Sequence, residues 1–136
     1  KDIKNLKFIH DDATTLHTFE ENSINSLSCL HAAEHFGLGR YNDPIDPEAY
    51  KKLISNIQRV LKRGGKLYFS VPIGQEKLLF NAHRIFNPKT ILDLFNSMTL
   101  TSFSYVDDSG KFIENSTINQ LDKAHYSCGL FEFEKH

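Results

Sequence analysis

The sequence predicts a single α/β domain with a mostly parallel sheet, and three observations lead to this expectation. Short apolar runs of strand length alternate with two stretches of helical periodicity. The run 23–30 lacks clean alternation of apolar and polar residues, which indicates a strand buried on both faces, as in parallel sheets. The 136 residues, of which 40% are hydrophobic, can build one core but hardly two. We therefore expect one domain spanning residues 1–136.

The first half of the chain contains two candidate strands and one candidate helix. Leu6–His10 is the first strand, closed by turn formers, and Ser23–Leu30 is the second. A helix is expected to begin at Asp46–Glu48, because the aspartate can cap it and the following proline suits its first turn. Gly64 and Gly65 end it. Its apolar stripe recurs at helical spacing: Leu53, Ile54, Ile57, Val60 and Leu61.

The second half continues the alternation and then closes with strands. Lys66–Val71 is expected as a strand that follows the glycines directly, and Asn87-Pro88 opens a second helix. Leu100–Val106 is the next strand and Asp107–Gly110 a turn. The last strand, Tyr126–Glu134, alternates apolar and polar side chains near its end. The second helix directs four residues inward: Ile91, Leu92, Phe95 and Met98.

Charge and cysteine content exclude several classes of partner. The 16 Lys and Arg nearly cancel the 17 Asp and Glu, so no overall field attracts nucleic acid or an anionic membrane. No apolar run approaches the roughly 20 residues of a spanning helix. Cys29 and Cys128 fall inside predicted strands without metal-type spacing and are expected to be buried, reduced thiols. These features indicate a cytoplasmic protein with a small-molecule substrate, and they leave a homo-oligomer open.

The segment Leu27–Tyr41 carries an acid, two histidines, an arginine and a tyrosine directly behind a strand. Within it, His31–His35 has the H-x-x-E-H pattern of one class of zinc peptidases. That chemistry needs both histidines on one face of a sustained helix and a third ligand. Gly37 and Gly39 break any helix within a turn of this segment. A zinc-dependent hydrolase is therefore the least favoured alternative, and we expect no metal.

Four segments resemble the second half of class I S-adenosylmethionine-dependent methyltransferases, in matching order and spacing: Phe8–Leu16, Glu21–Leu27, Leu30–His35 and Leu61–Leu67. Three segments are similar to a narrower family, catalogued within that superfamily as a domain of unknown function: Leu30–Pro47, Asn81–Phe86 and Cys128–Phe133. The resemblance covers nearly the whole chain. It implies a partial Rossmann-like methyltransferase sheet, mostly parallel with an antiparallel C-terminal strand, and S-adenosylmethionine as cofactor.

The resemblance also implies which positions meet the cofactor. Asp12 and Ala13 match the acidic and small pair that contacts the adenine, and His31 belongs to the segment that lines the methyl-transfer cleft. The superfamily's glycine-rich loop, whose backbone donors approach the cofactor closely, follows no strand of this sequence. We therefore expect either that an upstream segment completes the cofactor site or that the chain is a non-catalytic scaffold or interaction module.

Residue chemistry adds candidates for the reaction itself. A hydroxyl acceptor of a methyl group needs a base, and imidazole titrates near neutral pH. A glutamate can orient an imidazole or bind a sugar hydroxyl, an arginine can clamp a phosphate or carboxylate, and a tyrosine can stack on a ring. The candidate catalytic residues are His31, Glu34, His35 and His83, and the candidate substrate-binding residues are Arg40, Tyr41 and Arg84. The expected activity is methylation of a small hydroxylated, sugar-like acceptor. The alternative for Glu34, His35 and Arg40 is a hydrogen-bond network that braces the loop.

Overall fold

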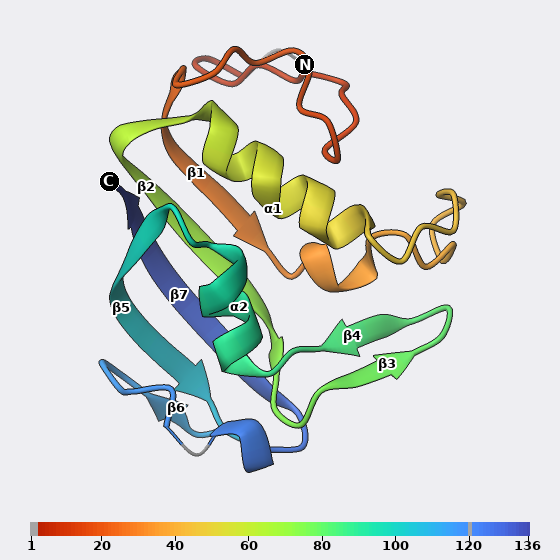
Figure 1. The fold of residues 1–136 in the computed structure, drawn as a ribbon, viewed down its shortest axis with the longest axis vertical. Helices are drawn as coiled ribbons and strands as arrows, with labels where there is room; N and C mark the ends of the chain where they lie inside the picture. The colour runs from red at the N-terminus through yellow and green to blue at the C-terminus, as the bar shows by residue number, and fades with distance from the viewer. Residues whose placement is uncertain (1–2, 120) are drawn as a thin grey trace.

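A computed structural model describes residues 3–119 and 121–136. Its main sheet has the strand order β1-β2-β7-β5-β6 (Figure 1). The strands of this sheet are β1 (Ile24–Leu30), β2 (Leu61–Ile73), β5 (Met98–Val106), β6 (Phe112–Ile113) and β7 (Ser127–Lys135). β1 and β2 are parallel, whereas β7 is antiparallel to both of its neighbours, β2 and β5. β1, β2 and β5 therefore share one direction and the C-terminal strand opposes them, which confirms the predicted sheet.

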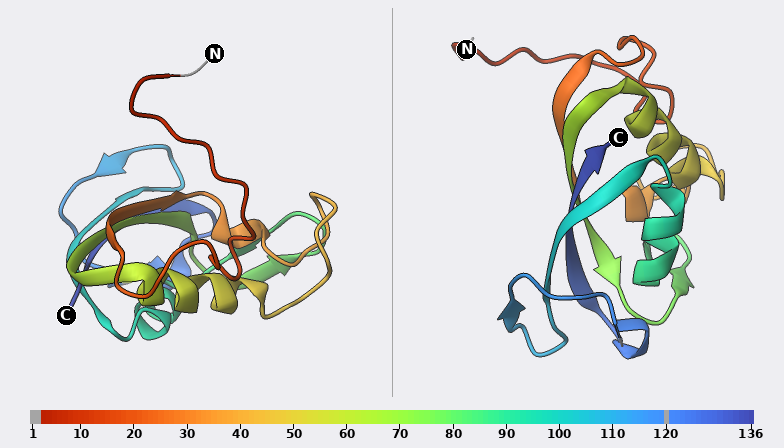
Figure 2. Two further views of the ribbon diagram at one scale, coloured as in Figure 1. Left: turned by 90° about the horizontal axis from the view of Figure 1, so that it is seen from above. Right: turned by 60° about the vertical axis from the view of Figure 1, so that its left-hand side comes forward.

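Two α-helices cover one face of this sheet (Figures 1 and 2). α1 spans Ala49–Val60 and α2 spans Pro88–Leu94, where the Asn87 side chain accepts a hydrogen bond from the Lys89 backbone N–H. A small hairpin, β3 (Lys77–Leu79) and β4 (His83–Ile85), projects from the end of β2; the sequence did not predict it. The short 3₁₀ turns are η1 (Ala33–His35) and η2 (Leu121–Lys123). Within residues 3–119 and 121–136, no helix is long and apolar enough to span a membrane.

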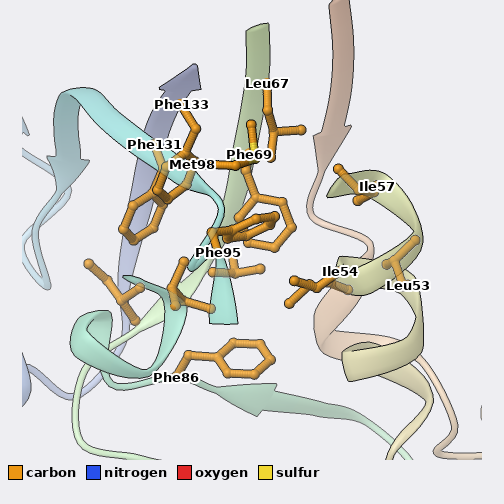
Figure 3. Close-up of a cluster of buried hydrophobic side chains, with 14 of the residues drawn as sticks. Leu53, Ile54, Ile57, Leu67, Phe69, Phe86, Phe95, Met98, Phe131 and Phe133 are labelled. Carbon is orange, nitrogen blue, oxygen red and sulfur yellow. The ribbon is translucent and has the colours of Figure 1, made fainter. Parts of the chain in front are cut away.

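The core between the sheet and the helices is built largely from phenylalanine (Figure 3). The Phe69 and Phe95 rings meet with centroids 5.0 Å apart, and Phe95 lies 4.8 Å from Phe133. The predicted stripe of α1 packs against the same core, as Figure 3 shows for three of its residues: Leu53, Ile54 and Ile57. Alternation along β7 directs Phe131 and Phe133 to this face, as expected from the sequence.

The predicted first strand, Leu6–His10, is wrong. The segment has no strand structure and leads away from the sheet (Figure 2), with Leu6 68% and Phe8 87% exposed. A strand needs a neighbour to accept and donate its backbone hydrogen bonds, and among the described residues β1 pairs with β2 alone. The apolar composition of this segment therefore does not suffice to make it a strand here.

Two local expectations for β1 and β2 also need correction. β1 is not buried on both faces: Leu30 is 59% exposed, because both α-helices lie on the other face of the sheet. The helix α1 ends at Val60, before the glycines rather than at them, and β2 already begins at Leu61. Pairing jumps from Ile24–Leu61 to Ser26–Lys66, so the glycine pair lies in an irregularity within β2.

Candidate functional site

The candidate site lies where β1 and β2 end and β7 begins. His31 follows β1 with φ of +48°, a left-handed conformation that is uncommon for a residue with a side chain. Its backbone N–H donates to the Ser70 carbonyl oxygen on β2 at 2.9 Å, which anchors this turn. The chain then enters η1, so the side chains of η1 face the region beyond the strand ends. A strained residue held by its neighbours is frequent at functional sites.

Glu34 is the buried centre of the site. Its side chain is 3% exposed, and Oε1 lies 3.3 Å from Nδ1 of His31 and 3.8 Å from Nε2 of His35. The other oxygen, Oε2, is buried and has no hydrogen-bond partner among the residues that the structure describes. A buried carboxylate with an unpartnered oxygen is costly, and such a group in a native fold calls for an explanation such as a ligand.

The tautomer of His35 is fixed by the hairpin. Nδ1 lies 2.7 Å from the Ala82 carbonyl oxygen. A carbonyl oxygen can only accept, so Nδ1 donates, and in the neutral ring Nε2 is left as an acceptor that faces Glu34. The His83 ring stands edge-on to His35 at 6.1 Å and packs against Tyr126 at 5.6 Å. Nε2 of His83 is a second buried atom without a partner in the described part of the chain.

A pocket of about 360 Å³ opens beside these groups. Its lining residues are His31, Ala32, His35, Phe36, Tyr41 and Asp43. The Tyr41 ring meets His35 edge-to-face at 5.4 Å and is 65% exposed, and the exposed Arg40 guanidinium lies 5.8 Å from the Tyr41 ring centroid. Aromatic and cationic side chains at the rim, with imidazoles at the base, suit a polar ligand with a ring.

A smaller pocket of about 170 Å³ adjoins the first, because both are lined by Phe36 and Asp43. Asp12 lines this second pocket; its Oδ1 accepts from the Thr14 backbone N–H at 2.8 Å and from the Thr14 hydroxyl at 2.7 Å. Ala13 packs against the hydrophobic core. The two pockets thus bring the residues expected at the adenine near those expected at the methyl-transfer cleft.

Asp43 also belongs to the site, although it is not among the site residues predicted from the sequence. Its carboxylate accepts from the Gly37 backbone N–H at 2.9 Å and from the Tyr41 backbone N–H at 3.2 Å. Burial alone would raise the pKa of Asp43, but these backbone donors outweigh it and hold the pKa below its ordinary value. The two pockets therefore share a carboxylate that is charged at neutral pH. The sequence signal that could have identified Asp43 is its position two residues after Tyr41 and directly before a proline.

Arg84 bonds to the backbone of η1 and the loop that follows it, and it does not line the pocket of about 360 Å³. It is 7% exposed, and its guanidinium donates to the Phe36 carbonyl oxygen at 2.6 Å and stacks 4.5 Å from the Tyr50 ring centroid. It also reaches the carbonyl oxygens of Glu34 and Pro47. Burial lowers the pKa of Arg84. Since its donors bind backbone carbonyls, Arg84 holds η1 and the following loop in place beneath the pocket.

The structure thus brings His31, Glu34, His35 and His83 close together: both His31 and His35 approach Glu34 Oε1, and the His83 ring packs on His35. No group of three or more His, Cys, Asp or Glu in residues 3–119 and 121–136 is placed to hold a metal ion. η1 is only three residues long, so the sustained helix that the zinc pattern requires does not form. In this arrangement the glutamate of the pattern pairs with the histidines on either side.

Solved structures with a similar fold define the class of this domain. The 1,6-didemethyltoxoflavin-N1-methyltransferase of Burkholderia thailandensis matches with a TM-score of 0.63 and 17% identity over 95% of this chain and 50% of that one. A SAM-dependent methyltransferase of Methanosarcina mazei matches with a TM-score of 0.60 and 15% identity over 92% of this chain and 65% of that one. The cyclase SpnF matches with a TM-score of 0.61 and 14% identity over 92% of this chain and 55% of that one. The chain has the class I methyltransferase fold and spans about half to two thirds of these proteins.

The sequence also matches a family model described as a Caenorhabditis protein of unknown function, DUF268, over residues 2–128. The chain belongs to this family, which confirms the resemblance to a domain of unknown function within the methyltransferase fold. A comparison with curated protein sequences gives no match. SpnF, a cyclase by its name, shows that this fold carries more than one kind of chemistry, so the activity must be argued from the site.

Proposed function

We propose that this chain forms the acceptor-binding part of an S-adenosylmethionine-dependent methyltransferase whose substrate is a small hydroxylated, sugar-like molecule. One observation carries the proposal: His35 Nε2 and Glu34 Oε1, both acceptors, lie 3.8 Å apart beside a pocket of about 360 Å³. At that separation the two atoms do not bond to each other, and His35, which lines the pocket, can accept at Nε2 the hydrogen of a ligand hydroxyl. The buried Glu34 carboxylate lies behind His35 and does not line the pocket.

His35 is the proposed base. Because Nδ1 donates to the Ala82 carbonyl oxygen, Nε2 is the ring atom able to accept the proton of the acceptor hydroxyl. The cofactor, when bound, supplies a methyl group on a positively charged sulfur. Glu34 stabilises the imidazolium that forms when His35 takes the proton, and His31 Nδ1 lies 3.3 Å from the same carboxylate oxygen. His83 packs edge-on against His35 and keeps its ring in position.

The paired pockets suit the chemistry of this cofactor. In the smaller pocket, Asp12 presents a carboxylate that can accept from an adenine amino group. Asp43, at the junction of the two pockets, offers negative charge to a cationic sulfonium. Ala13 packs against the hydrophobic core and so helps to hold Asp12 in place. His31 lines the larger pocket, where the methyl group would be transferred. These placements support cofactor binding across the two pockets.

The acceptor would occupy the larger pocket. Tyr41 forms its outer wall and can stack on a sugar ring, while Arg40 at the rim can pair with a phosphate or carboxylate on the same molecule. Arg84 contributes indirectly, because it fixes the loop that carries these residues. Holding acceptor and methyl group in line accounts for much of the rate in such a displacement.

A non-catalytic methyltransferase-like module is the second candidate. The observation that favours it is the sequence itself, since no glycine-rich loop follows a strand within the 136 residues. Such a module would retain the hydrogen-bond network around Glu34 as a brace for η1. It would bind neither cofactor nor hydroxylated acceptor in these pockets.

The experiment is transfer of a radiolabelled methyl group from S-adenosylmethionine to a panel of monosaccharides, glycosides and sugar phosphates. Wild type, His35→Asn and the control His10→Asn are compared; His10 is exposed and lies outside the site. We expect His35→Asn to lower kcat by about 100-fold with little change in cofactor KM, and His10→Asn to have no effect. Cofactor binding with no transfer to any of these acceptors would contradict the acceptor class, and absence of both would favour the non-catalytic module.

A further inference from the structure

The thiol of Cys128 is not used by the methyl-transfer proposal, although it contacts His31, which that proposal includes. Cys128 is the second residue of β7, half-buried, and its Sγ lies 3.1 Å from Nε2 of His31. The opposite ring nitrogen of His31, Nδ1, lies 3.3 Å from Glu34 Oε1. Thiol, imidazole and carboxylate thus form one line of close contacts, in which Cys128 and His31 are 97 positions apart in the sequence.

The direction of each hydrogen bond in this line follows from the chemistry of its members. When the Nδ1 proton of His31 lies toward the Glu34 carboxyl group, 3.3 Å away, the neutral ring keeps a lone pair on Nε2. That lone pair accepts the Cys128 thiol hydrogen. The left-handed backbone of His31, anchored to Ser70, fixes the ring between the two partners. A nucleophile, a base and an acid that orients the base are the parts of an activated thiol.

We propose that Cys128 is a site of covalent modification by neutral, soft carbon electrophiles, with His31 as the base and Glu34 as the residue that positions it. In the step, a bond forms between Sγ and the electrophilic carbon, and the bond from that carbon to its leaving group breaks with its electron pair. The thiol proton passes to Nε2 of His31 and then to solvent. This site goes beyond the proposed methyl transfer and does not depend on it.

The surroundings of the thiol explain both the need for a base and the preference for neutral reagents. Burial and the Glu34 carboxylate raise the pKa of the Cys128 thiol, so at neutral pH it is protonated and reacts only if its proton is removed. The same buried negative charge repels anionic electrophiles that approach the sulfur. We therefore expect the rate of alkylation of Cys128 to depend on His31. Its preference for neutral over anionic electrophiles should depend on Glu34.

Cys29 is an internal control within the same chain. It lies on β1, and burial, followed by the charge of Glu34, raises the pKa of its thiol to about 11. The Ala33 backbone N–H donates to its sulfur, and in the described part of the chain no imidazole bonds to it. Burial and the Glu34 carboxylate thus raise the pKa of both thiols. Of the two, Cys128 is the one that lies within hydrogen-bonding distance of an imidazole, that of His31.

The test is alkylation by iodoacetamide at pH 7, with the extent at each cysteine followed by peptide mass spectrometry. We expect Cys128 to react at least about tenfold faster than Cys29. His31→Asn should remove this difference, whereas His10→Asn should preserve it. Equal rates at the two cysteines, or an unchanged ratio in a folded His31→Asn protein, would overturn the proposal.

A second comparison needs no variant and remains decisive if His31→Asn does not fold. Iodoacetamide and iodoacetate differ in charge but little in size. We expect the ratio of their rates at Cys128 in the native protein to favour the neutral reagent by at least about fivefold more than in the urea-unfolded chain. Glu34→Gln should reduce that preference. An equal ratio in native and unfolded protein would contradict the role of Glu34 and with it the site.

Discussion

The phenylalanine core and the polar end of the sheet differ in how they are held together. Among the core rings, contacts such as that of Phe103 with Phe131, with centroids 4.9 Å apart, are non-directional and leave no polar atom to satisfy. At the polar end, directional hydrogen bonds hold His31 to Ser70 and His35 to Ala82, and two buried polar atoms remain without partners in the described residues. The core therefore supplies most of the stability, while the polar end retains the unsatisfied groups that can bind a ligand.

The largest expected effect on stability follows truncation of the core. Phe131 is 1% exposed and packs between the rings of Phe103 and Phe69. Phe131→Ala should lower the free energy of unfolding by about 3–5 kcal/mol, measured by urea denaturation. Phe112→Ala, at a position that is 54% exposed, is the matched control and should change it by less than about 0.5 kcal/mol. A loss below about 1 kcal/mol for Phe131→Ala would contradict the importance of this core.

The next effect is expected in the loop that carries the pocket. Gly37 has φ of +75°, and a Cβ added there would lie 1.8 Å from the Asp46 carbonyl oxygen. Gly110 has a similar φ of +85° but no atom within 4 Å of an added Cβ. Gly110→Ala should therefore cost only the backbone strain, about 1 kcal/mol, and Gly37→Ala about 2–3 kcal/mol because the loop must also move. Chemical denaturation of both variants tests this; equal losses would show that the loop has room to adjust.

A smaller, pH-dependent effect is expected at the start of β7. The backbone N–H groups of His125 and Tyr126 and the Ser127 hydroxyl donate to the Asp108 carboxylate, and they hold its pKa below the usual value of 3.8. Because the folded-state pKa is depressed, this stabilisation is present above the unfolded pKa and is lost as the pH falls through the folded value. Asp108→Asn should therefore lower Tm at pH 6 and make Tm less dependent on pH below about 4.

Thermal unfolding between pH 3 and pH 6 checks this prediction. Asp93→Asn, at an exposed position on α2, is the control and should leave the pH profile unchanged. If Asp108→Asn and wild type lose stability over the same pH range by the same amount, the carboxylate does not organise the start of β7.

The sequence predicted those parts of the fold that depend on local pattern. Alternation in β7 placed Phe131 and Phe133 in the core, and the predicted helical stripe lies on α1 except for Leu61, which begins β2. Leu6–His10 has an equally apolar pattern and yet is no strand, because pairing is decided by neighbours far away in the sequence. The hairpin β3–β4 was missed for a related reason, since its strands are only three residues long.

For the site, too, the sequence predicted what depends on local spacing and missed the contacts between distant residues. His31, Glu34 and His35 were predicted from a segment of five residues, and their side chains lie close together in the structure. The Ala82 carbonyl that fixes His35 and the thiol of Cys128 reach the site only through the fold, at 47 and 97 positions' separation. The roles predicted for Arg40 and Tyr41 stay predictions. Tyr41 lines the larger pocket, and the Arg40 guanidinium lies 5.8 Å from the Tyr41 ring centroid.

The most direct test of the central claim is a titration of the ¹⁵N-labelled protein with S-adenosylmethionine, followed by NMR. We expect saturable shifts confined to amides around the two pockets, including those of Asp12, His31 and Asp43, with the amides of the phenylalanine core unchanged. Binding in the micromolar range would support a cofactor site across these pockets. Absence of shifts at millimolar cofactor, or shifts confined to other surfaces, would contradict it.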